Sequence, residues 1–484
     1  METKIFDELL KHKYEILLGV IVIVSLFVGI KYIGIDSVWP DEAFYAWNGY
    51  QLVREPFQIT DEMLKTPLYV PFLLIGLLSI FVDKLIAAKL TVLLFSIVGI
   101  IATYYIGKML KNELVGIIAA GFMAFNPIVM FLTGRALTDI PIAAMMALCI
   151  LALFKYEQEK HWKWGLLLGL CVAGAFFTKM SGVILIPVLG LYFVLTRRTK
   201  IFGELKDKKF LSLLGVGIIT FVPFFIFNML KFGSLLPTKL SVYGTSYIFK
   251  GGQFYYITSM PQFVAWWLLP FLVIGLLFAV LNFKRPKQLA LLLWFVIGLV
   301  IISGIGEKDL RYLGPIMPAI FLCIAYGISK FNINKKAEWI ILGISAILAV
   351  SMFMGGIAHI ESKANSYMGF KEAGEWLKMN VPEDSIIYAG SERAIRSFSD
   401  IQYEEYGGRL RAFPTNITTF EEEVANKSNV FAVVDVWEYT QPDWIYPLSN
   451  EKINALFNMS FNVTYFVQST LGGQKTATVI VLGK

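Results

Sequence analysis

Cysteine, histidine and several common catalytic motifs are scarce or missing in this chain. Its 484 residues include three cysteines and three histidines. Cys149, Cys171 and Cys323 lie within apolar runs, which excludes a disulfide framework and a Cys-x-x-Cys metal site. The absence of a Walker A motif, Gly-x-Ser-x-Gly and His-Glu-x-x-His argues against nucleotide hydrolysis, a serine-histidine-aspartate site and zinc chemistry. We expect no cofactor; a divalent cation is compatible with the sequence, but nothing in the sequence indicates one.

Charge is also scarce, whereas apolar residues are abundant. Charged residues make up 16% of the chain and hydrophobic residues 56%, a balance that excludes an ordinary soluble enzyme and predicts a multi-pass membrane protein. The formal net charge is +7, but the basic residues lie mostly in short loops between apolar runs. That distribution is typical of membrane topology and indicates no nucleic-acid partner.

The apolar runs predict about eleven membrane spans. We place them at about residues 14–35, 84–107, 113–132, 139–155, 163–179, 181–196, 210–230, 261–283, 289–304, 314–329 and 338–357. The run 67–82 is short and broken by prolines, and treating it as a surface helix puts the basic loops on one side of the membrane. By the positive-inside rule we expect a cytoplasmic N-terminus in the cell membrane and outward-facing loops around Asp41, Asp139 and Arg311.

The last part of the chain differs in composition from the rest. Residues 362–484 carry four alternating apolar segments of the kind that forms strands, at 385–388, 430–436, 461–466 and 476–482. Thr418 and Glu421 form a capping-box pattern that predicts the start of a helix. We therefore expect two domains: a membrane module in residues 1–361 and a small extracytoplasmic α/β domain in residues 362–484.

Two adjacent carboxylates follow the first predicted span, in the sequence Trp39-Pro40-Asp41-Glu42. Apolar residues recur at helical spacing over residues 43–53, so an amphipathic helix should start at this pair and lie along the membrane surface. A helix N-terminus stabilises negative charge, which suits Asp41 to act as a base. The alternative interpretation is that both acids only cap an interfacial helix.

Further charged residues lie in or next to the predicted outer loops. They are Lys65, Arg135, Asp139, Lys179 and Arg311, with Tyr312 beside the last. Cations at a membrane surface can bind a lipid phosphate. The competing interpretations are structural, because lysines snorkel at helix ends, Asp139 can cap a helix or pair with Arg135, and charges commonly flank outer helix ends.

Taken in order, these motifs resemble the GT-C membrane glycosyltransferases, in particular the protein O-mannosyltransferases and the aminoarabinose transferases. The resemblance rests on Asp41-Glu42, residues 65–69, residues 135–141, Thr178-Lys179 and residues 311–318. It implies an inverting transferase that takes a sugar, mannose or another hexose, from a polyprenyl-phosphate or dolichyl-phosphate carrier in the membrane lipid. The acceptor would be a hydroxyl group on a protein, glycan or lipid at the outer membrane face.

The resemblance also implies roles for single residues. Asp41 would be the catalytic base, with Glu42 and Asp139 as supporting acids. Lys65 would bind the carrier phosphate. The other residues implied in substrate binding are Arg135, Lys179, Arg311 and Tyr312. Since the carrier brings its own activated phosphate, no nucleotide site is needed.

Two other classes of function stay open at this point. A secondary transporter could use the paired acids and Lys89, which lies inside a predicted span and must face a polar cavity or reach the interface. The sequence shows no two-half repeat, however, and its charges gather at one surface. A receptor anchored by the membrane part is the third possibility, although eleven spans exceed what an anchor requires.

Overall fold

The chain forms two compact units. The computed structural model describes residues 12–35, 37–54, 63, 68–159, 161–197, 206–234, 252–306, 308–404, 407–437, 441–471 and 474–484. One unit, called here the helical unit, comprises Met1–Ile33, Asp61–Leu74 and Lys89–Ile360. The other, called the α/β unit, comprises Gly34–Thr60, Ile75–Ala88 and Glu361–Lys484. Neither unit is a continuous segment, because residues of the first predicted outer loop cluster with the carboxy-terminal residues.

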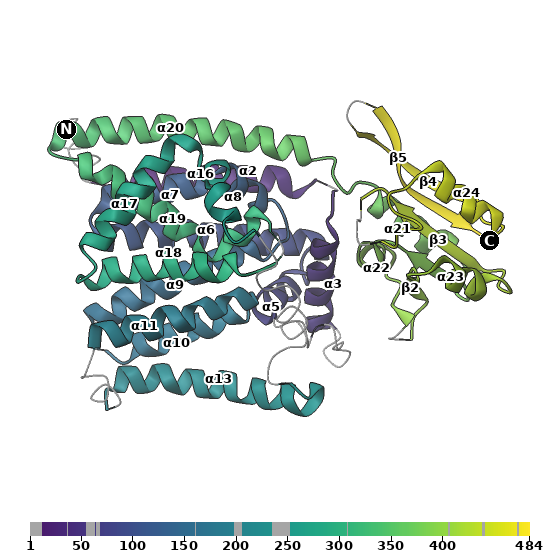
Figure 1. Ribbon diagram of the computed structural model, residues 1–484, viewed down its shortest axis with the longest axis horizontal. Coiled ribbons are helices and arrows are strands. Elements are labelled where there is room, and N and C mark those ends of the chain that lie inside the picture. The colour runs from purple at the N-terminus through teal and green to yellow at the C-terminus, as the bar shows by residue number, and fades with distance from the viewer. Residues whose placement is uncertain are drawn as a thin grey trace. The chain divides into compact units, whose positions relative to one another are not determined.

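Eight helical segments within the described ranges are long and apolar enough to cross a membrane. In chain order they are α2 (Lys13–Ile33), α6 (Lys84–Leu110), α9 (Asp139–Gln158), η1 with α11 (Met180–Arg197), α13 (Lys208–Phe232), α18 (Pro286–Ser303), η4 with α19 and η5 (Leu310–Phe331), and α20 (Lys335–Lys363). Figure 1 shows most of them running side by side. The chain is therefore a multi-pass membrane protein, as its composition predicted.

A ninth candidate span is broken in the middle. Its two halves, α7 (Glu113–Phe125) and α8 (Pro127–Thr133), are bent by 63° at the break. Asn126 between them caps α8, because its side-chain oxygen accepts hydrogen bonds from two backbone N–H groups of that helix (3.0 and 3.2 Å). Pro127 has no N–H with which to continue α7, so a new helix starts there.

Two of the predicted spans form shorter helices. The run 163–179 forms α10 (Lys163–Phe176), whose 14 residues extend about 21 Å, against about 30 Å of hydrocarbon. The run 261–283 contains η3 and α17 (Trp266–Leu281), preceded by a separate short helix. The count of eleven spans stays a prediction. α5 (Tyr69–Leu78) has 10 residues, too few to cross a bilayer, and its place at the membrane surface stays a prediction.

The helical unit has a densely packed centre. All 12 residues of α19 (Met317–Ile328) are buried. A glycine lets α17 approach this helix closely, since a Cβ added at Gly275 would lie 1.9 Å from the Cys323 carbonyl oxygen. Cys149 and Cys171 are, like Cys323, buried free thiols. The three cysteines therefore serve as small packing residues in apolar helices.

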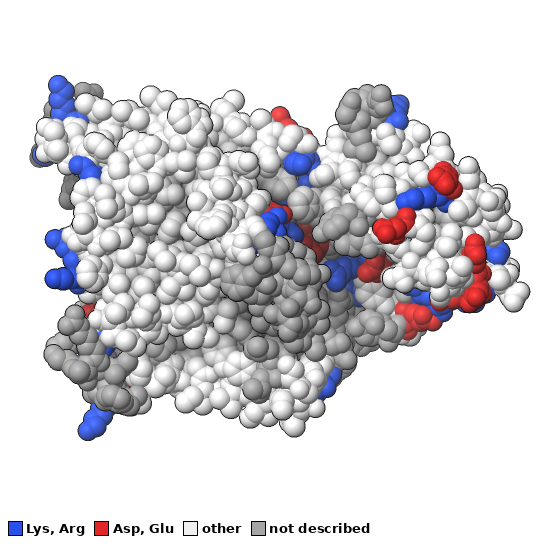
Figure 2. Space-filling view, in the orientation of Figure 1, with Lys and Arg blue, Asp and Glu red and all other residues white. Residues whose placement is uncertain are grey.

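Basic side chains gather at one end of the helices. Lys287, at the start of α18, donates a hydrogen bond to the Met109 carbonyl near the end of α6 (2.7 Å). Lys111 donates to the Ser329 carbonyl just after α19 (2.7 Å). Figure 2 shows a group of Lys and Arg side chains at one end of the helical unit and an almost uncharged side surface. These two contacts bring together three of the predicted basic loops, around residues 108–111, 284–287 and 330–336. The cytoplasmic N-terminus and the extracytoplasmic α/β domain remain predictions.

Lys89, inside α6, is 1% exposed. Its ammonium group donates a hydrogen bond to the carbonyl of Ile33, the last residue of α2 (3.0 Å). A cation at this position offsets the partial negative charge of a helix C-terminus. This contact gives Lys89 a role in helix packing and does not require the ion pathway of a transporter.

The α/β unit is built around a five-stranded sheet of order β2-β1-β3-β5-β4. Its strands are β1 (Ile386–Ala389), β2 (Leu410–Ala412), β3 (Val430–Asp435), β4 (Asn462–Leu471) and β5 (Gln474–Gly483). β1 is parallel to β2 and β3, whereas β5 is antiparallel to β3 and β4. The four predicted strands are confirmed. β2 was not predicted, because three residues are too few to show an alternating pattern.

Helices cover both faces of this sheet. α21 (Phe370–Asn380) and α22 (Glu392–Ser399) pack on one face, and α23 (Ile417–Val424) and α24 (Asn450–Asn458) on the other. The predicted capping box of α23 is wrong in its first residue. The cap is Asn416, whose side-chain oxygen accepts the Thr418 N–H (3.1 Å). Asn is at least as good a cap as Thr, and Asn416 starts the helix two residues earlier than the predicted cap Thr418.

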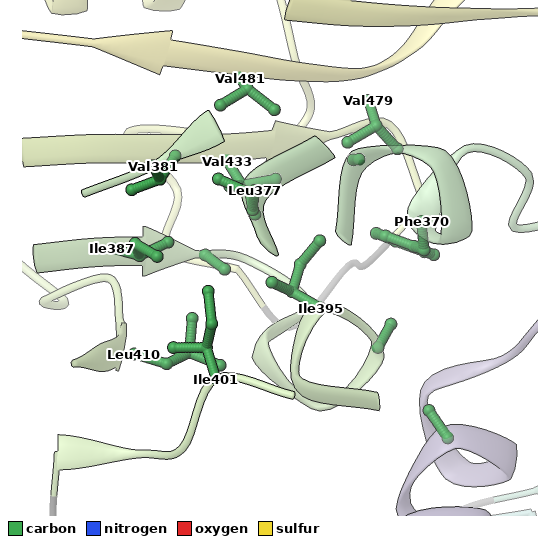
Figure 3. Close-up of a cluster of buried hydrophobic side chains, with 14 of the residues drawn as sticks. Phe370, Leu377, Val381, Ile387, Ile395, Ile401, Leu410, Val433, Val479 and Val481 are labelled. Carbon is green, nitrogen blue, oxygen red and sulfur yellow. The ribbon is translucent and has the colours of Figure 1, made fainter. Parts of the chain in front are cut away.

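A hydrophobic core fills the space between the sheet and the helices α21 and α22 (Figure 3). Leu377 and Ile395 from the two helices meet Val433 from β3, and all three are at most 1% exposed. Val38 and Ala43, from the first predicted outer loop, belong to the same core and are fully buried. Since full burial of a valine contributes about 1.5–3 kcal/mol, this loop is part of the fold of the α/β unit.

Candidate active site

Asp41 and Glu42 lie in the first turn of α3 (Pro40–Arg54), the helix that the spacing of apolar residues predicted. Pro40 suits the first helical position, where no N–H is required. Glu42 is fully buried, and its Oε2 accepts a hydrogen bond from the Trp39 backbone N–H (2.8 Å). Glu42 is the third residue of the helix, and it reaches back to the backbone N–H of the residue before the helix, as the acid of a capping box does. This contact fixes the helix start. The Asp41 side chain is 37% exposed.

An arginine from the last part of the chain approaches Asp41. Arg393 lies in the first turn of α22, with its Nη1 3.9 Å from Asp41 Oδ1. Its guanidinium carbon also lies 5.0 Å from the centroid of the Phe44 ring. Sequence reasoning missed Arg393, because no local pattern connects this short helix with a loop near the other end of the chain.

The helices α3 and α22 are held against each other by a second arginine. Arg396 is fully buried, and its guanidinium carbon lies 4.1 Å from the Tyr403 ring centroid and 5.4 Å from that of Trp47. Each such cation–π contact contributes about 0.5–2 kcal/mol, the upper value applying when the cation is desolvated. Since Trp47 belongs to α3, these contacts fix the rotation of α22 about its axis and, with it, the position of Arg393.

Aromatic rings hold the residue that precedes α3. The ring centroid of Trp39 lies 5.6 Å from that of Tyr367, which stacks on Trp437 at 5.6 Å and an interplanar angle of 20°. Tyr367 has φ +62°, in the left-handed region that a bulky residue rarely adopts. The cost of such a conformation, about 1–3 kcal/mol, is offset by the surrounding contacts. The start of α3 is therefore rigidly built.

An ion cluster lies where α22 ends. Asp400 binds Lys84 through one carboxylate oxygen (2.7 Å) and Lys378 through the other (2.5 Å). Burial acts to raise the pKa of Asp400, but the hydrogen bonds and charges of these two lysines outweigh it and lower the pKa below the ordinary value. The Lys84 ammonium group also lies 4.5 Å from the Trp47 ring centroid. The cluster thus joins α3 and α22 at a second point.

A second group of predicted residues lies in the helical unit, at the start of α9. Asp139 is the first residue of this helix, and its side chain is 3% exposed. Its Oδ1 lies 2.5 Å from Lys179 Nζ. Thr138 occupies the cap position without a side-chain capping bond. Asp139 therefore engages a cation from a distant turn.

The segment η4 (Leu310–Ile316) lies against this ion pair. A Cβ added at Gly314 would lie 2.8 Å from the backbone oxygen of Asp139, so the absence of a side chain permits the contact. The ring centroid of Tyr312 is 5.3 Å from Lys179 Nζ and 5.3 Å from the guanidinium carbon of Arg311. Lys179, Arg311 and Tyr312 therefore lie together near the start of α9, and Lys179 is paired with Asp139.

The remaining predicted cations have different surroundings. Arg135 is 4% exposed, and its guanidinium carbon lies 5.2 Å from the Phe131 ring centroid. Arg311 Nε lies 3.3 Å from the carboxylate of Asp309, which also caps η4 by accepting the Arg311 backbone N–H (2.9 Å). Lys65 lies outside the described residues. Lys179 is 23% exposed beside the buried Asp139, and Arg311 is 20% exposed beside Asp309.

The predicted site residues fall into two sets. Asp41 and Glu42 belong to the α/β unit, whereas Asp139, Lys179, Arg311 and Tyr312 belong to the helical unit. Their shared pocket stays a prediction. Within the described ranges, no group of three or more His, Cys, Asp or Glu could hold a metal ion. The chemistry that these residues offer is that of a partly exposed carboxylate, which can accept a proton, and of paired cations, which can bind a phosphate.

Comparisons with known proteins address the fold. A family model for dolichyl-phosphate-mannose-protein mannosyltransferases matches residues 65–227. No curated protein sequence matches the chain. The crystal structure of ArnT from Cupriavidus metallidurans bound to undecaprenyl phosphate superposes with a TM-score of 0.71 at 14% identity, covering 97% of this chain and 98% of that one.

Two further structures share the arrangement. The archaeal oligosaccharyltransferase AglB from Archaeoglobus fulgidus, in complex with an inhibitory peptide and a dolichol-phosphate, matches with a TM-score of 0.58 at 12% identity, over 88% of this chain and 70% of that one. The arabinofuranosyltransferase AftD from Mycobacteria matches with a TM-score of 0.59 at 11% identity, over 96% of this chain and 41% of that one. The predicted resemblance to the GT-C membrane glycosyltransferases is confirmed at the level of the fold.

Proposed function

We propose that this protein is an inverting glycosyltransferase that takes a sugar from a polyprenyl-phosphate carrier and transfers it to an acceptor hydroxyl. One observation carries the proposal: the fold matches ArnT over 97% of the chain, and that structure is bound to undecaprenyl phosphate. The family match over residues 65–227 supports the same class of donor. We propose mannose or another hexose as the sugar, and a protein, glycan or lipid at the outer membrane face as the acceptor.

The reaction is a direct displacement. The acceptor oxygen forms a bond to the anomeric carbon while the bond from that carbon to the phosphate oxygen breaks, and the phosphate departs with the electron pair. Asp41 takes the proton from the acceptor hydroxyl as the new bond develops. Attack opposite the leaving phosphate inverts the anomeric centre. In this mechanism a carboxylate and several cations are sufficient.

The other residues support this step in different ways. Glu42 fixes the first turn of α3 through its bond to the Trp39 N–H (2.8 Å). Lys179 and Arg311, beside Tyr312, bind the carrier phosphate and stabilise the charge that develops on it, together with Lys65 and Arg135. Asp139 holds Lys179 in place through the 2.5 Å ion pair.

The experiment is a transfer assay with purified protein in liposomes. Radiolabelled polyprenyl-phosphate mannose is supplied with extracts of membrane lipid, glycan or protein, and the labelled acceptor fraction is identified. Asp41→Asn removes the base while keeping the size of the side chain, so the turnover rate should fall by about 10²–10⁴-fold. Asp384→Asn is the matched control, because Asp384 accepts a hydrogen bond from Asn429 (2.8 Å), a contact that involves no residue of either set.

Carrier binding separates catalysis from recognition. Asp41→Asn should bind the labelled carrier as the unchanged protein does, and its melting temperature in detergent should match that of Asp384→Asn. Full transfer activity in Asp41→Asn would contradict the mechanism. Movement of an intact carrier or another solute across the liposome membrane, without transfer of sugar, would favour a transporter instead.

A further inference from the structure

We propose that Arg393 is a positioning residue for Asp41, supplied to the active site by the carboxy-terminal residues of the α/β unit. This inference rests on the proposed function of Asp41 as the base. Its starting observation is the distance of 3.9 Å between Arg393 Nη1 and Asp41 Oδ1. The two side chains are 31% and 37% exposed, so the pair lies at the edge of the packed interior and is accessible to a substrate.

The position of Arg393 is fixed by its neighbours on the same helix. Arg396, one turn further along α22, is fully buried between the rings of Tyr403 and Trp47. Ile395 and Ala394 of α22 are fully buried in the hydrophobic core. A helix held on two sides cannot turn without breaking these contacts. Arg393 is therefore directed towards α3 by packing, and its approach to Asp41 is part of the fold.

The length of the contact determines what Arg393 does. An N–H···O hydrogen bond spans about 2.7–3.2 Å, so at 3.9 Å the guanidinium group acts on the carboxylate through its charge. The guanidinium group attracts the Asp41 carboxylate towards one orientation. It does so without donating a close hydrogen bond to Oδ1. Its positive charge also offsets the repulsion between the carboxylate and an approaching phosphate. Both effects favour transfer without a direct part for Arg393 in the proton transfer.

The contact with Phe44 keeps the guanidinium group in place when Asp41 becomes neutral. Its guanidinium carbon lies 5.0 Å from the centroid of this ring, which is 3% exposed and belongs to the same face of α3 as the carboxylate. Arginine stacks on aromatic rings, whereas lysine offers a compact charge without a planar group. Lysine at position 393 should therefore restore the charge and only part of the orientation.

The kinetic test compares Arg393→Ala, Arg393→Lys and the control Arg411→Ala in the transfer assay. Arg411 belongs to the same unit, but its partners are Glu404, Glu423 and Tyr388. In Arg393→Ala we expect kcat to fall by about 10–100-fold, as expected for a misplaced catalytic group, with KM for the donor changed less than kcat. Arg393→Lys should recover part of the loss. Arg411→Ala should keep the activity of the unchanged protein.

Chemical rescue excludes a purely structural role. Millimolar guanidinium ion should restore part of kcat in Arg393→Ala and leave Arg411→Ala unchanged, since only the first variant has an empty guanidinium position beside the base. Equal kcat in Arg393→Ala and the unchanged protein would overturn the inference. So would a loss of kcat that neither lysine nor guanidinium ion restores and that follows the loss of melting temperature.

A labelling experiment tests the contact between Arg393 and Asp41 without any sugar donor. Carbodiimide coupling of glycinamide to Asp41, measured by peptide mass spectrometry on the full chain, should increase severalfold in Arg393→Ala and remain unchanged in Arg411→Ala. Equal labelling of Asp41 in all three proteins would contradict the contact itself. If the labelling responds but the unchanged protein transfers no sugar, the contact stands and the proposed function fails.

Discussion

The two carboxylates named in the proposed mechanism, Asp41 and Asp139, have contrasting environments. The Asp41 side chain is 37% exposed and has a guanidinium group at 3.9 Å. The Asp139 side chain is 3% exposed and binds Lys179 at 2.5 Å. A general base must reach the substrate and change its protonation state during the reaction, whereas a buried ion pair resists both changes. Under the proposed mechanism, this contrast suits Asp41 to act as the base and Asp139 to position a cation.

The same contrast appears in the elements that carry the two residues. Asp41 lies on a helix whose start is fixed by Glu42 and by the ring of Trp39. Asp139 begins α9, and Gly314 of η4 packs directly against its backbone. The approach is so close that only a residue without a side chain fits there. One acid is thus held by its helix and remains accessible, and the other is enclosed by its neighbours. Four measurements test this difference, from the largest expected effect to the smallest.

The largest effect on stability should follow from breaking the buried pair. Lys179→Met leaves the Asp139 charge buried without this partner, which typically costs about 3–5 kcal/mol. The apparent melting temperature in detergent should therefore drop clearly, and Asp139→Asn combined with Lys179→Met should recover much of it. Lys155→Met is the control, because its pair with Glu159 is 38% and 45% exposed and such pairs contribute about 0.2–1 kcal/mol. Equal effects of both lysine variants would refute the comparison.

A methyl group at position 314 should be the next most costly change. Gly314→Ala places a Cβ 2.8 Å from the Asp139 backbone oxygen and 3.3 Å from the Ile142 side chain. Overpacking of this kind costs about 1–3 kcal/mol and would push η4 away from α9. Donor KM should rise because Arg311 and Tyr312 move with η4. Gly215→Ala, where nothing lies within 4 Å, should leave both melting temperature and KM unchanged; a neutral Gly314→Ala would show that the two segments are not packed as described.

The ring of Tyr312 should have a smaller effect. Tyr312→Ala removes the aromatic face beside Lys179 and Arg311, and each cation–π contact at such a partly exposed position contributes about 0.5–1 kcal/mol. Tyr312→Phe keeps the ring and should keep the melting temperature. If Phe and Ala destabilise the protein equally, the hydroxyl group and not the ring is responsible.

The smallest effect should be a dependence of stability on pH at the Asp400 cluster. Lys84 and Lys378 hold the pKa of Asp400 below its ordinary value. A carboxylate with a lowered folded-state pKa contributes stability above its unfolded-state pKa, near 3.9, and this contribution is lost as the pH falls through the folded-state value. The melting temperature should therefore fall in acid more steeply for the unchanged protein than for Asp400→Asn. Parallel acid profiles of the two proteins would argue against the cluster.

Local patterns in the sequence predicted much of the fold. The period of apolar residues over 43–53 predicted a helix that starts at Asp41 and Glu42, and the structure has α3 over Pro40–Arg54. Alternation predicted β1, β3, β4 and β5. These elements are predictable because the signal lies in neighbouring residues. The cap of α23 was missed because Asn416 and Thr418 are both suitable cap residues. The strand β2 was missed because three residues are too few to show an alternating pattern.

Contacts between distant segments could not be predicted in the same way. Asp139 and Lys179 were each identified as outer charges, but their 2.5 Å pairing depends on how α9 packs with its neighbours. Arg393 gave no signal at all, since an arginine in the first turn of a short helix is ordinary. The expectation that residues 43–53 lie along the membrane surface also did not include the burial of Ala43 and Trp47 in the α/β unit. Such contacts are set by tertiary packing.

The presence of Val38 and Ala43 in the core of the α/β unit has a consequence for biosynthesis. A ribosome makes these residues early, whereas the strands and helices that bury them appear only after the last span has been inserted. During that interval their apolar side chains and the Asp41 carboxylate lack their final partners. A nascent chain that has inserted its membrane helices therefore lacks the packed form of this loop until the carboxy-terminal strands and helices have been made.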